Sequence, residues 1–353
     1  MKTLKYFSMF SGIGGFEYGM QQSKHKFKNV GYSEIDKYAR SIYEKHYPNH
    51  ICFGDATKIN TEDLPDFSIL IGGFPCQTFS IAGKRKGFND TRGTMFFELA
   101  RILRDKQPTY FLFENVRGIL SHEEGRTLNR ILKILNELGY DVLWQNYNSK
   151  DYNVPQNRER IYFKGYFREK CPGEVLLESR SSKQSNGRLI PLNNKKQAQQ
   201  VFSTNGISMT LCANGGGQGG KTGLYKVEVS DNENSTSVSE EVINHFTKVN
   251  TTQNVTTTSE GDVFALTTRN RTSPLHKKQD NYVIENGSNF RIRRLTPIEC
   301  ERLQAFPDDY TKYGKDGELI SDTQRYKCLG NAVTTTVVTA IVNQMFDKKG
   351  ELI

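Results

Sequence analysis

The chain has 353 residues, of which 36% are hydrophobic, and its formal net charge is +9. This length allows two domains, and the apolar content is enough for a sizeable core. No apolar run approaches the roughly 20 residues of a membrane-spanning helix, so we expect no membrane partner. The positive charge favours a polyanion such as nucleic acid, although many soluble proteins are mildly basic.

The cysteines are spaced too widely for a zinc site. No two of them form a CxxC pair, so we expect no bound metal. Reduced thiols in the cytosol are the natural interpretation, which predicts a cytoplasmic protein. The six are Cys52, Cys76, Cys171, Cys212, Cys300 and Cys328.

The start of the chain predicts a nucleotide-binding unit. A strand over Lys5–Phe10 leads into a turn with three glycines, and Glu17–Gln21 then reads as helical. Such glycines let a ligand approach the backbone, and the helix N-terminus offers free N–H groups. A second strand near Val30–Ser33 ends at Glu34, about 20 residues after Gly14, where such folds place a carboxylate on ribose hydroxyls. The glycine spacing matches neither GxGxxG nor a P-loop.

A helix and a short strand are expected next. The helix covers Asp36–Tyr47 and stops before Pro48, and the strand covers Ile51–Phe53. Asp55 follows directly, where its carboxylate suits either a contact to a base or amine or the N-cap of the next helix. On the sequence alone the two roles have equal weight.

The stretch Ile69–Ser80 carries the strongest chemical signal. Its apolar start, Ile69–Ile71, predicts a buried strand, and two glycines, Phe74 and Pro75 lead to Cys76. A thiol is thus placed at the end of a core strand, the edge where α/β sheets bind ligands. A thiolate with a lowered pKa is a nucleophile, whereas most isolated cysteines are small buried hydrophobes.

A basic loop and another strand end accompany this stretch. Gly83–Thr94 combines glycines with four basic residues, which suits either a lid that contacts phosphates or an ordinary solvated loop. An amphipathic helix is expected over Met95–Lys106. Tyr110–Phe113 then predicts a buried strand that delivers Glu114 to the same sheet edge as Cys76.

One core helix and a pair of strands complete the first half. Gly125–Leu138 has leucine and isoleucine on one face, and Asp141–Tyr147 and Arg160–Phe167 read as strands around a proline turn. Arg158 and Arg160 are two residues apart and would share one face of an extended chain.

The composition changes beyond Cys171. Residues 171–200 are polar, and Glu228–Asp262 is rich in Ser, Thr and Asn, which predicts a mobile insertion. Thr296 is an expected N-cap with Pro297 at the first helical position. An apolar helix through Phe346 should return to the first part of the chain.

One Cys, one Glu and an Arg pair beside a nucleotide-type pocket suit methylation of a pyrimidine at C5. A thiolate that adds to C6 makes C5 enamine-like, and a carboxyl group at N3 relieves the developing charge. An arginine can hold O2 or support that carboxyl group, and a sulfonium cofactor can supply the methyl group. A base inside a duplex must first be flipped out of the stack.

The chain resembles the DNA (cytosine-5) methyltransferase family in its HhaI-like, restriction-modification or phage type. Seven blocks occur in the family's order: FSGIGGFE, SEID, GGFPCQTFS, FENVRG, QNRERIYF, RRLTPIECERLQAFP and LGNAV. The resemblance implies that Cys76 is the nucleophile and Glu114 the partner of N3. It also implies that Arg158 and Arg160 are supporting catalytic arginines.

S-adenosyl-L-methionine is the cofactor that the resemblance implies. Ile35 stands where a Trp is often found, which would weaken stacking on the adenine. The implied cofactor-binding residues are Phe10, Gly12, Gly14, Phe16, Glu34, Ile35, Asp55, Pro75, Asn331 and Val333.

The middle segment FSTNGISMTLCANGGGQGGKTG is similar to the target-recognition region of HhaI-like members. Gln197 aligns with a Gln that fills the gap left by the flipped base, and Gln200 stands where a guanine-reading Arg is found. An amide and an Arg fork do not read guanine equally, and both glutamines also fit plain loop positions. The implied DNA-contacting residues are Ser80, Lys84, Arg92, Gln197, Gln200, and the family's TL pair, Thr210 and Leu211.

We therefore expect an α/β fold: a Rossmann-like S-adenosylmethionine-dependent methyltransferase sheet with a second, smaller target-recognition domain. The catalytic, cofactor-binding domain would comprise residues 1–170 and 313–353, and the target-recognition domain residues 171–312, with the mobile insertion at 228–262. The implied enzyme is a monomeric DNA (cytosine-5-)-methyltransferase that acts on double-stranded DNA, with or without a cognate restriction endonuclease. A tRNA cytosine-5 methyltransferase and a catalytically inactive DNA-binding protein are the alternatives.

Overall fold

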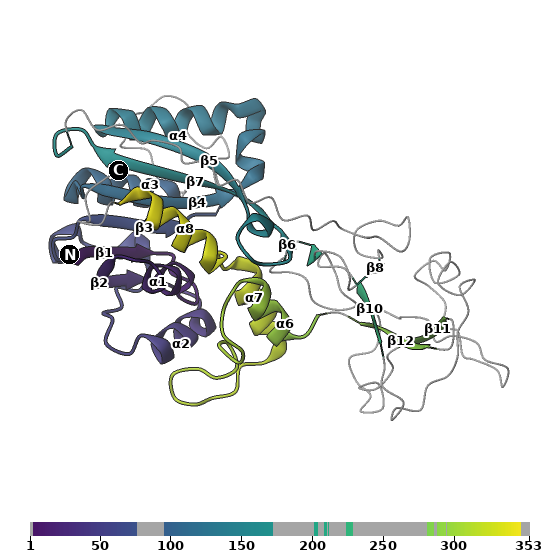
Figure 1. Ribbon diagram of the computed structural model, residues 1–353. Coiled ribbons are helices and arrows are strands. Elements are labelled where there is room, and N and C mark those ends of the chain that lie inside the picture. The colour runs from purple at the N-terminus through teal and green to yellow at the C-terminus, as the bar shows by residue number, and fades with distance from the viewer. Residues whose placement is uncertain are drawn as a thin grey trace.

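A computed structural model describes residues 3–75, 95–171, 201–203, 208–209, 211, 224–228, 281–285, 288–293 and 295–346 (Figure 1). Its main body is an α/β unit around a six-stranded sheet with the strand order β2-β1-β3-β4-β7-β5. Its strands are β1 Thr3–Met9, β2 Lys26–Ser33, β3 Ile69–Gly73, β4 Tyr110–Val116, β5 Tyr140–Asn148 and β7 Glu159–Phe167. The expected α/β sheet is therefore confirmed.

The first four strands in this order run parallel, and β7 is antiparallel to both β4 and β5. The chain leaves β1 toward β2 and then crosses to β3 on the other side of β1. This reversal makes the carboxyl ends of β1 and β3 a topological switch point, where open α/β sheets bind their ligands.

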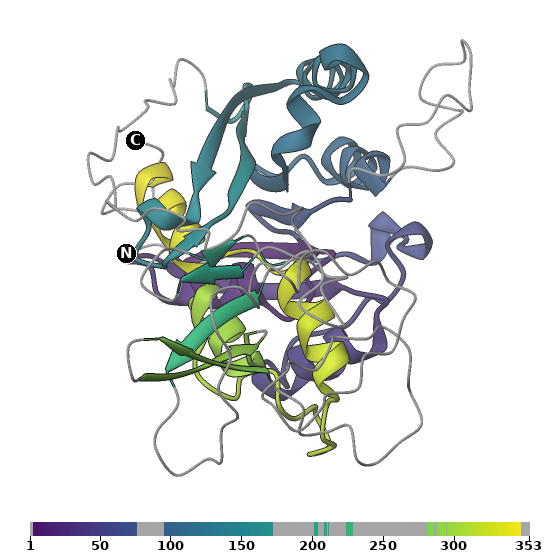
Figure 2. The same cartoon turned by 90° about the vertical axis from the view of Figure 1, so that its right-hand side faces the viewer.

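Helices cover both faces of the sheet (Figures 1 and 2). Residues 4, 6, 69, 71, 110 and 112 pack with the helices α1 and α8, whereas residues 7, 9, 70, 111 and 113 pack with α3 and α4. This alternation follows from the two-residue repeat of a strand buried on both faces. The α-helices are α1 Gly15–Gln21, α2 Lys37–His46, α3 Met95–Lys106, α4 Arg126–Glu137, α6 Pro297–Leu303, α7 Asp322–Asn331 and α8 Thr335–Met345.

Short 3₁₀ turns and small strands make up the remaining described elements. The turns are η1 Ala56–Lys58, η2 Thr61–Asp63, η4 Arg117–Leu120, η5 His122–Gly125 and η6 Ser149–Asp151. A two-stranded pairing joins β6 Gln156–Asn157 to β9 Ser208–Met209. A four-stranded sheet has the order β11-β12-β10-β8, formed by β8 Val201–Ser203, β10 Leu224–Glu228, β11 Asn281–Glu285 and β12 Ser288–Arg293.

A third core lies beside the sheet, between α2, α6 and α7. Leu303, Phe306 and Tyr310 pack there with Ile13 of the glycine turn and Ala39 of α2. Residues 295–312, expected in the smaller domain, therefore pack with the first part of the chain. We propose that the second segment of the larger domain begins near residue 295 and not at the expected residue 313.

Several expected elements have different bounds. The second strand begins at Lys26, four residues before its expected start, and Ile51–Phe53 forms only an isolated bridge between Cys52 and Tyr32. The helix Met95–Lys106 matches its expected bounds. Thr296 is the N-cap of α6, as expected, and it also forms a capping box with Glu299. The insertion 228–262 lies, apart from its first residue, outside the described residues.

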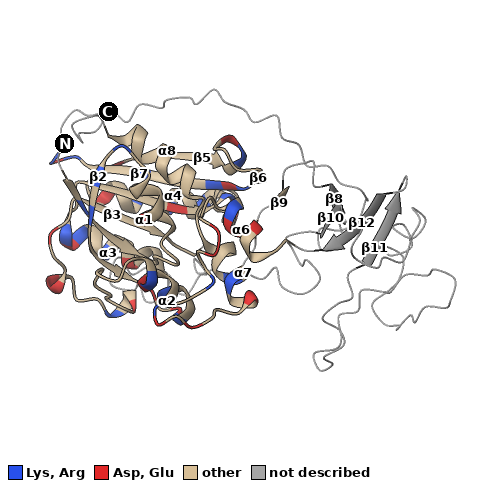
Figure 3. Cartoon of the chain, turned by 60° about the horizontal axis from the view of Figure 1, so that its bottom comes forward, with Lys and Arg blue, Asp and Glu red and all other residues tan. Residues whose placement is uncertain are grey.

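Charge is mixed over the described body, where Lys and Arg are interspersed with Asp and Glu (Figure 3). Within the described ranges, none of the helices combines the length and the apolar character needed to cross a membrane.

Candidate active site

The turn after β1 has an unusual backbone. Phe10, Gly12 and Gly14 all have positive φ, at 54°, 58° and 86°. A side chain on Gly12 would meet nothing within 4 Å, whereas one on Gly14 would lie 2.6 Å from the Tyr47 ring. Gly12 therefore leaves an open approach to the backbone, and Gly14 allows close packing underneath it.

Glu34, at the end of β2, fixes the shape of this turn. Its Oε2 accepts the Gly12 N–H at 2.8 Å, and its Oε1 accepts the N–H groups of Ile35 and Asp36 at 2.9 and 2.8 Å. Burial raises the pKa of the Glu34 carboxyl group, and these N–H groups oppose that rise. A carboxylate oxygen has two lone pairs, so Oε2 can accept a further hydrogen bond from a ligand beside Gly12.

Other expected cofactor residues surround the same edge of the sheet. Ile35 is 74% exposed, and Pro75 and Asn331 are also exposed. Phe16 and Val333 are buried in the core between α1, α8 and the sheet. These five residues thus divide into an accessible group and a supporting group.

Asp55 has the helix-capping role that the sequence left open. Its Oδ1 accepts the Thr57 N–H at 3.0 Å and the Thr57 hydroxyl at 2.8 Å, and these bonds lower the pKa of the Asp55 carboxyl group. It lies just after Gly54, whose carbonyl accepts the Ser33 hydroxyl at 2.7 Å. This pairing ties Asp55 to the end of β2.

Glu114, at the end of β4, forms an ion pair with Arg160 of the neighbouring strand β7. The Oε1 to Nε distance is 2.9 Å, and both side chains are largely buried. Oε2 lies against β3, since a Cβ on Gly73 would come within 3.0 Å of it. Burial raises the pKa of the Glu114 carboxyl group, while Arg160 and Arg158 act in the opposite direction.

The end of β3 is held beside Glu114. Asn115 donates from its side-chain amide to the Phe74 carbonyl at 2.8 Å, and the Phe74 N–H donates to the Glu114 carbonyl at 3.3 Å. Cys76 itself lies outside the described residues. Its chain neighbour Pro75 is therefore the last described position before the expected nucleophile.

Arg158 has different partners from Arg160. It is 2% exposed, and its guanidinium group donates to the Leu211 carbonyl at 2.8 Å and to the Gly330 and Ala332 carbonyls at 3.2 and 2.7 Å. Its charge still acts on Glu114, but these hydrogen bonds join backbone segments on both sides of Asn331. The two arginines therefore have separate roles: Arg160 pairs with Glu114, and Arg158 binds backbone carbonyls.

Of the residues expected to contact DNA, the structure describes only Leu211. Leu211 is buried, and its N–H donates to the side chain of Gln156 at 3.2 Å. The other expected positions, Ser80, Lys84, Arg92, Gln197, Gln200 and Thr210, lie outside the described residues.

Two buried glutamines were missed as structural partners of the site. Gln156 donates to the Leu303 carbonyl at 2.7 Å, and Gln304 donates to the Leu329 carbonyl at 2.9 Å. Thr334 donates to Gln304 at 2.7 Å. Both glutamines lie inside blocks that resemble the family, QNRERIYF and RRLTPIECERLQAFP, and this was the available signal for a structural role. A buried side-chain amide must be hydrogen-bonded, so it can join separate segments of the chain.

Comparison with known proteins agrees with this geometry. A family model described as "C-5 cytosine-specific DNA methylase" matches residues 4–347. The Type II methyltransferase M1.ScrFI of Lactococcus lactis subsp. cremoris is 34% identical, over 98% of this chain and 79% of its own length. The orphan methyltransferase M.SPRI of Bacillus phage SPR is 32% identical, over 98% of each chain.

A solved structure supports the fold at lower identity. The Entamoeba histolytica methyltransferase EhMeth has a TM-score of 0.64 and 18% identity, covering 99% of this chain and 100% of that one. With a sheet whose strand ends gather a glycine turn, a buried acid and an arginine, and with a family match over nearly its whole length, the chain belongs to the C-5 cytosine-specific DNA methylases.

Proposed function

We propose that this DNA cytosine methyltransferase transfers a methyl group from S-adenosyl-L-methionine to C5 of cytosine in a short duplex site, through base flipping and a covalent adduct with Cys76. One observation carries the proposal. The Glu114 carboxyl group is paired with Arg160 and set against Gly73, three residues before the expected thiol. An acid of raised pKa at that position suits protonation of a ring nitrogen.

In this mechanism the Cys76 sulfur forms a bond to C6 of the flipped cytosine, and Glu114 holds a proton at N3. Arg160 keeps the carboxyl group oriented and offsets its charge after proton transfer. After C5 has received the methyl group, solvent water takes the C5 proton, the C6–S bond breaks and the N3 proton returns to Glu114, so that the thiolate and the acid are both restored. Arg158 keeps the segments around Leu211 and Asn331 in place.

The turn after β1 fits a nucleoside cofactor. Gly12 has open space where its side chain would be, and Glu34 holds a carboxylate oxygen beside it. Ile35 presents an exposed apolar side chain at the same strand end, suited to one face of an adenine. S-adenosylmethionine bound there would supply the electrophilic methyl group.

Duplex DNA is the proposed substrate because the matching family is described as "C-5 cytosine-specific DNA methylase". A duplex base must leave the stack before a thiol can reach C6. Because the relatives include both Type II and orphan enzymes, a paired endonuclease is not part of the proposal.

The test is methyl transfer from labelled S-adenosylmethionine to plasmid DNA, with tRNA offered in competition. We expect DNA labelling by the wild type and by Cys52→Ser, a control at an exposed cysteine. Cys76→Ser should lose essentially all labelling. A duplex that contains 5-fluorocytosine should form a stable adduct with the wild type only, because the fluorine cannot leave as the C5 proton does.

Equal labelling by the wild type and Cys76→Ser would remove Cys76 as the nucleophile. Preferential labelling of tRNA would overturn the DNA substrate. Bisulfite sequencing of the labelled plasmid would identify the methylated site.

A further inference from the structure

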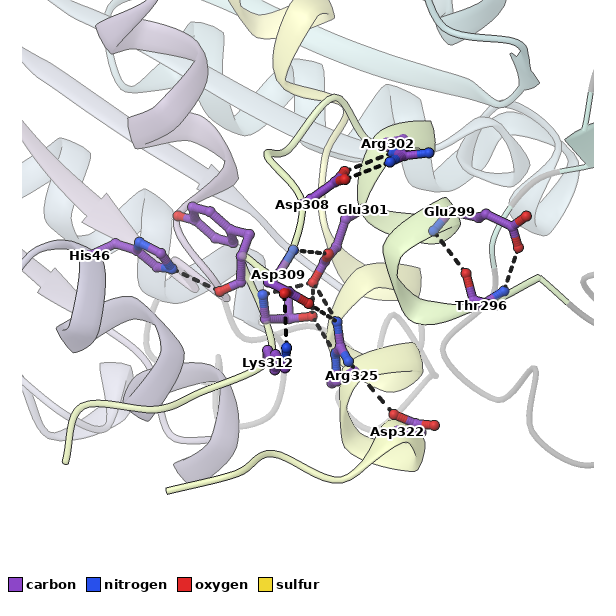
Figure 4. Close-up of polar contacts among 12 residues, drawn as sticks. His46, Thr296, Glu299, Glu301, Arg302, Asp308, Asp309, Lys312, Asp322 and Arg325 are labelled. Carbon is purple, nitrogen blue, oxygen red and sulfur yellow. Dashed lines mark hydrogen bonds and ion pairs between the residues drawn. The ribbon is translucent and has the colours of Figure 1, made fainter. Parts of the chain in front are cut away.

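The segment after the motif RRLTPIECERLQAFP has no role in the proposed chemistry, yet it is built around a charged side chain in the core. Glu301 of α6 is fully buried, and its Oε1 lies 3.0 Å from Nη2 of Arg325 on α7. Arg325 also faces Asp309 and Asp322 at 3.8 and 3.7 Å (Figure 4). A buried charge of this kind is retained only when it is fully paired.

Glu301 binds both chain neighbours of Tyr310. Its Oε2 accepts the Asp309 N–H at 2.7 Å, and its Oε1 accepts the Thr311 N–H at 2.8 Å. The Thr311 hydroxyl also donates to Oε1 and accepts from Nε of Arg325 at 3.0 Å. The backbone on either side of Tyr310 is therefore fixed to α6 and α7.

The Tyr310 side chain extends to the glycine turn from the backbone segment that Glu301 binds. Its hydroxyl donates to the Ile13 carbonyl at 3.0 Å. A Cβ on Gly14 would lie only 3.3 Å from the Tyr310 hydroxyl oxygen. Its ring stacks on His46 of α2 with centroids 3.7 Å apart, and Nε2 of His46 lies 2.8 Å from the Tyr310 carbonyl (Figure 4). His46 thus contacts both the ring and the carbonyl of Tyr310, while the Tyr310 hydroxyl supports the turn.

We infer that Tyr310 is a positioning residue for the cofactor turn, and that Glu301 and Arg325 hold it in place. The inference rests on the proposed function, because it assigns S-adenosylmethionine to the turn at Gly12 and Gly14. Without the hydroxyl, the Ile13 carbonyl loses its buried partner. The turn then keeps its Glu34 hydrogen bonds but loses its support beneath Gly14.

The test compares Tyr310→Phe with Tyr140→Phe. Tyr140 is also buried, and its hydroxyl donates to a backbone carbonyl, that of Pro108, at 2.8 Å. Calorimetric titration with S-adenosylmethionine, without DNA, should show a Kd about 3- to 10-fold higher for Tyr310→Phe, the effect of one hydrogen bond. Tyr140→Phe should bind as the wild type does, although both variants lose similar thermal stability.

Hydrogen exchange provides a readout that needs no ligand. Amides of residues 11–18 should exchange faster in Tyr310→Phe than in the wild type or Tyr140→Phe. In turnover, Tyr310→Phe should raise KM for the cofactor and leave kcat unchanged at saturation.

Equal cofactor affinity and equal exchange in Tyr310→Phe and the wild type would overturn the inference. An equal loss of affinity in Tyr140→Phe would also overturn it, because the effect would then be a general loss of stability. Failure of the wild type to bind S-adenosylmethionine would refute the proposed cofactor, and the exchange comparison would still decide whether Tyr310 positions the turn.

Discussion

Two Glu–Arg pairs of nearly equal length have opposite surroundings. Glu114 and Arg160 are 2.9 Å apart at the strand ends, and Glu301 and Arg325 are 3.0 Å apart between α6 and α7. Both oxygens of Glu301 accept backbone N–H groups in addition to the arginine. Glu114 has Arg160 on one oxygen, while the other lies against the Gly73 backbone.

The difference shows why an ion pair alone does not identify an active site. Glu301 has its acceptor sites occupied by its own chain, so it fixes a fold. Glu114 combines burial, which raises the pKa of its carboxyl group, with an oxygen directed toward the strand that leads to Cys76. We therefore propose that Glu114, and not Glu301, is the acid that acts on a substrate.

The largest effect should come from removing the acid of the first pair. Glu114→Gln keeps the shape but cannot protonate N3, so the rate of methyl transfer should fall by about 10²- to 10⁴-fold. Glu159→Gln is the control, because Glu159 is the chain neighbour of Arg160 on β7 and its own partner, Arg117, is exposed. Single-turnover labelling of DNA measures both. Retention of more than a tenth of the rate by Glu114→Gln would contradict the role.

The second pair should affect stability more than chemistry. Arg325→Met leaves Glu301 buried without its cation, so the free energy of unfolding should fall by about 3–5 kcal/mol. Arg302→Met is the matched control, because Arg302 pairs with the exposed Asp308 and its loss should lower the free energy of unfolding far less. Urea unfolding gives both values. Adding Glu301→Gln to Arg325→Met should restore part of the loss, and equal effects of the two arginines would refute the distinction.

A third buried acid, Glu17, has no ion pair among the described residues and extends the comparison. Glu17 is fully buried in α1 and accepts the Tyr43 hydroxyl at 3.1 Å, and burial raises the pKa of its carboxyl group to about 7. The folded state therefore keeps a proton that the unfolded chain loses near pH 4.5. Its contribution to stability is fully present below that pH and is lost as pH rises through 7.

Glu17→Gln should remove this dependence. The free energy of unfolding of the wild type, relative to Glu17→Gln, should fall by about 2–3 kcal/mol between pH 5 and pH 8.5. Chemical unfolding at the two pH values measures it. The same change with pH in both proteins would show that Glu17 does not titrate on unfolding.

Much of the catalytic edge could be predicted from local sequence. Hydrophobic runs placed β3 and β4, so the position of Glu114 at a strand end followed from the pattern alone. Turn and capping chemistry placed Gly14 and Thr296 equally well. These predictions succeeded because each depends on residues a few positions apart.

Long-range contacts were harder to predict. Arg158 and Arg160 share a strand-like spacing, yet their partners lie on different segments, at 211 and 330–332 for one and at 114 for the other. The start of β2 was missed because Lys26 and Lys28 alternate with Phe27 and Asn29 on a strand at the edge of the sheet. Edge strands often carry such charges, which hides them from hydrophobic patterning.

The packing of α8 on α1 also has a consequence for synthesis. The Thr339 hydroxyl donates to the Gly19 carbonyl at 2.7 Å, and Val338 shares a core with Phe16 and Met20. While the polypeptide is still emerging from a ribosome, the part of this sheet face that α8 covers stays exposed until residues 335–346 have been translated. Nascent chains that lack α8 would present this apolar surface to chaperones.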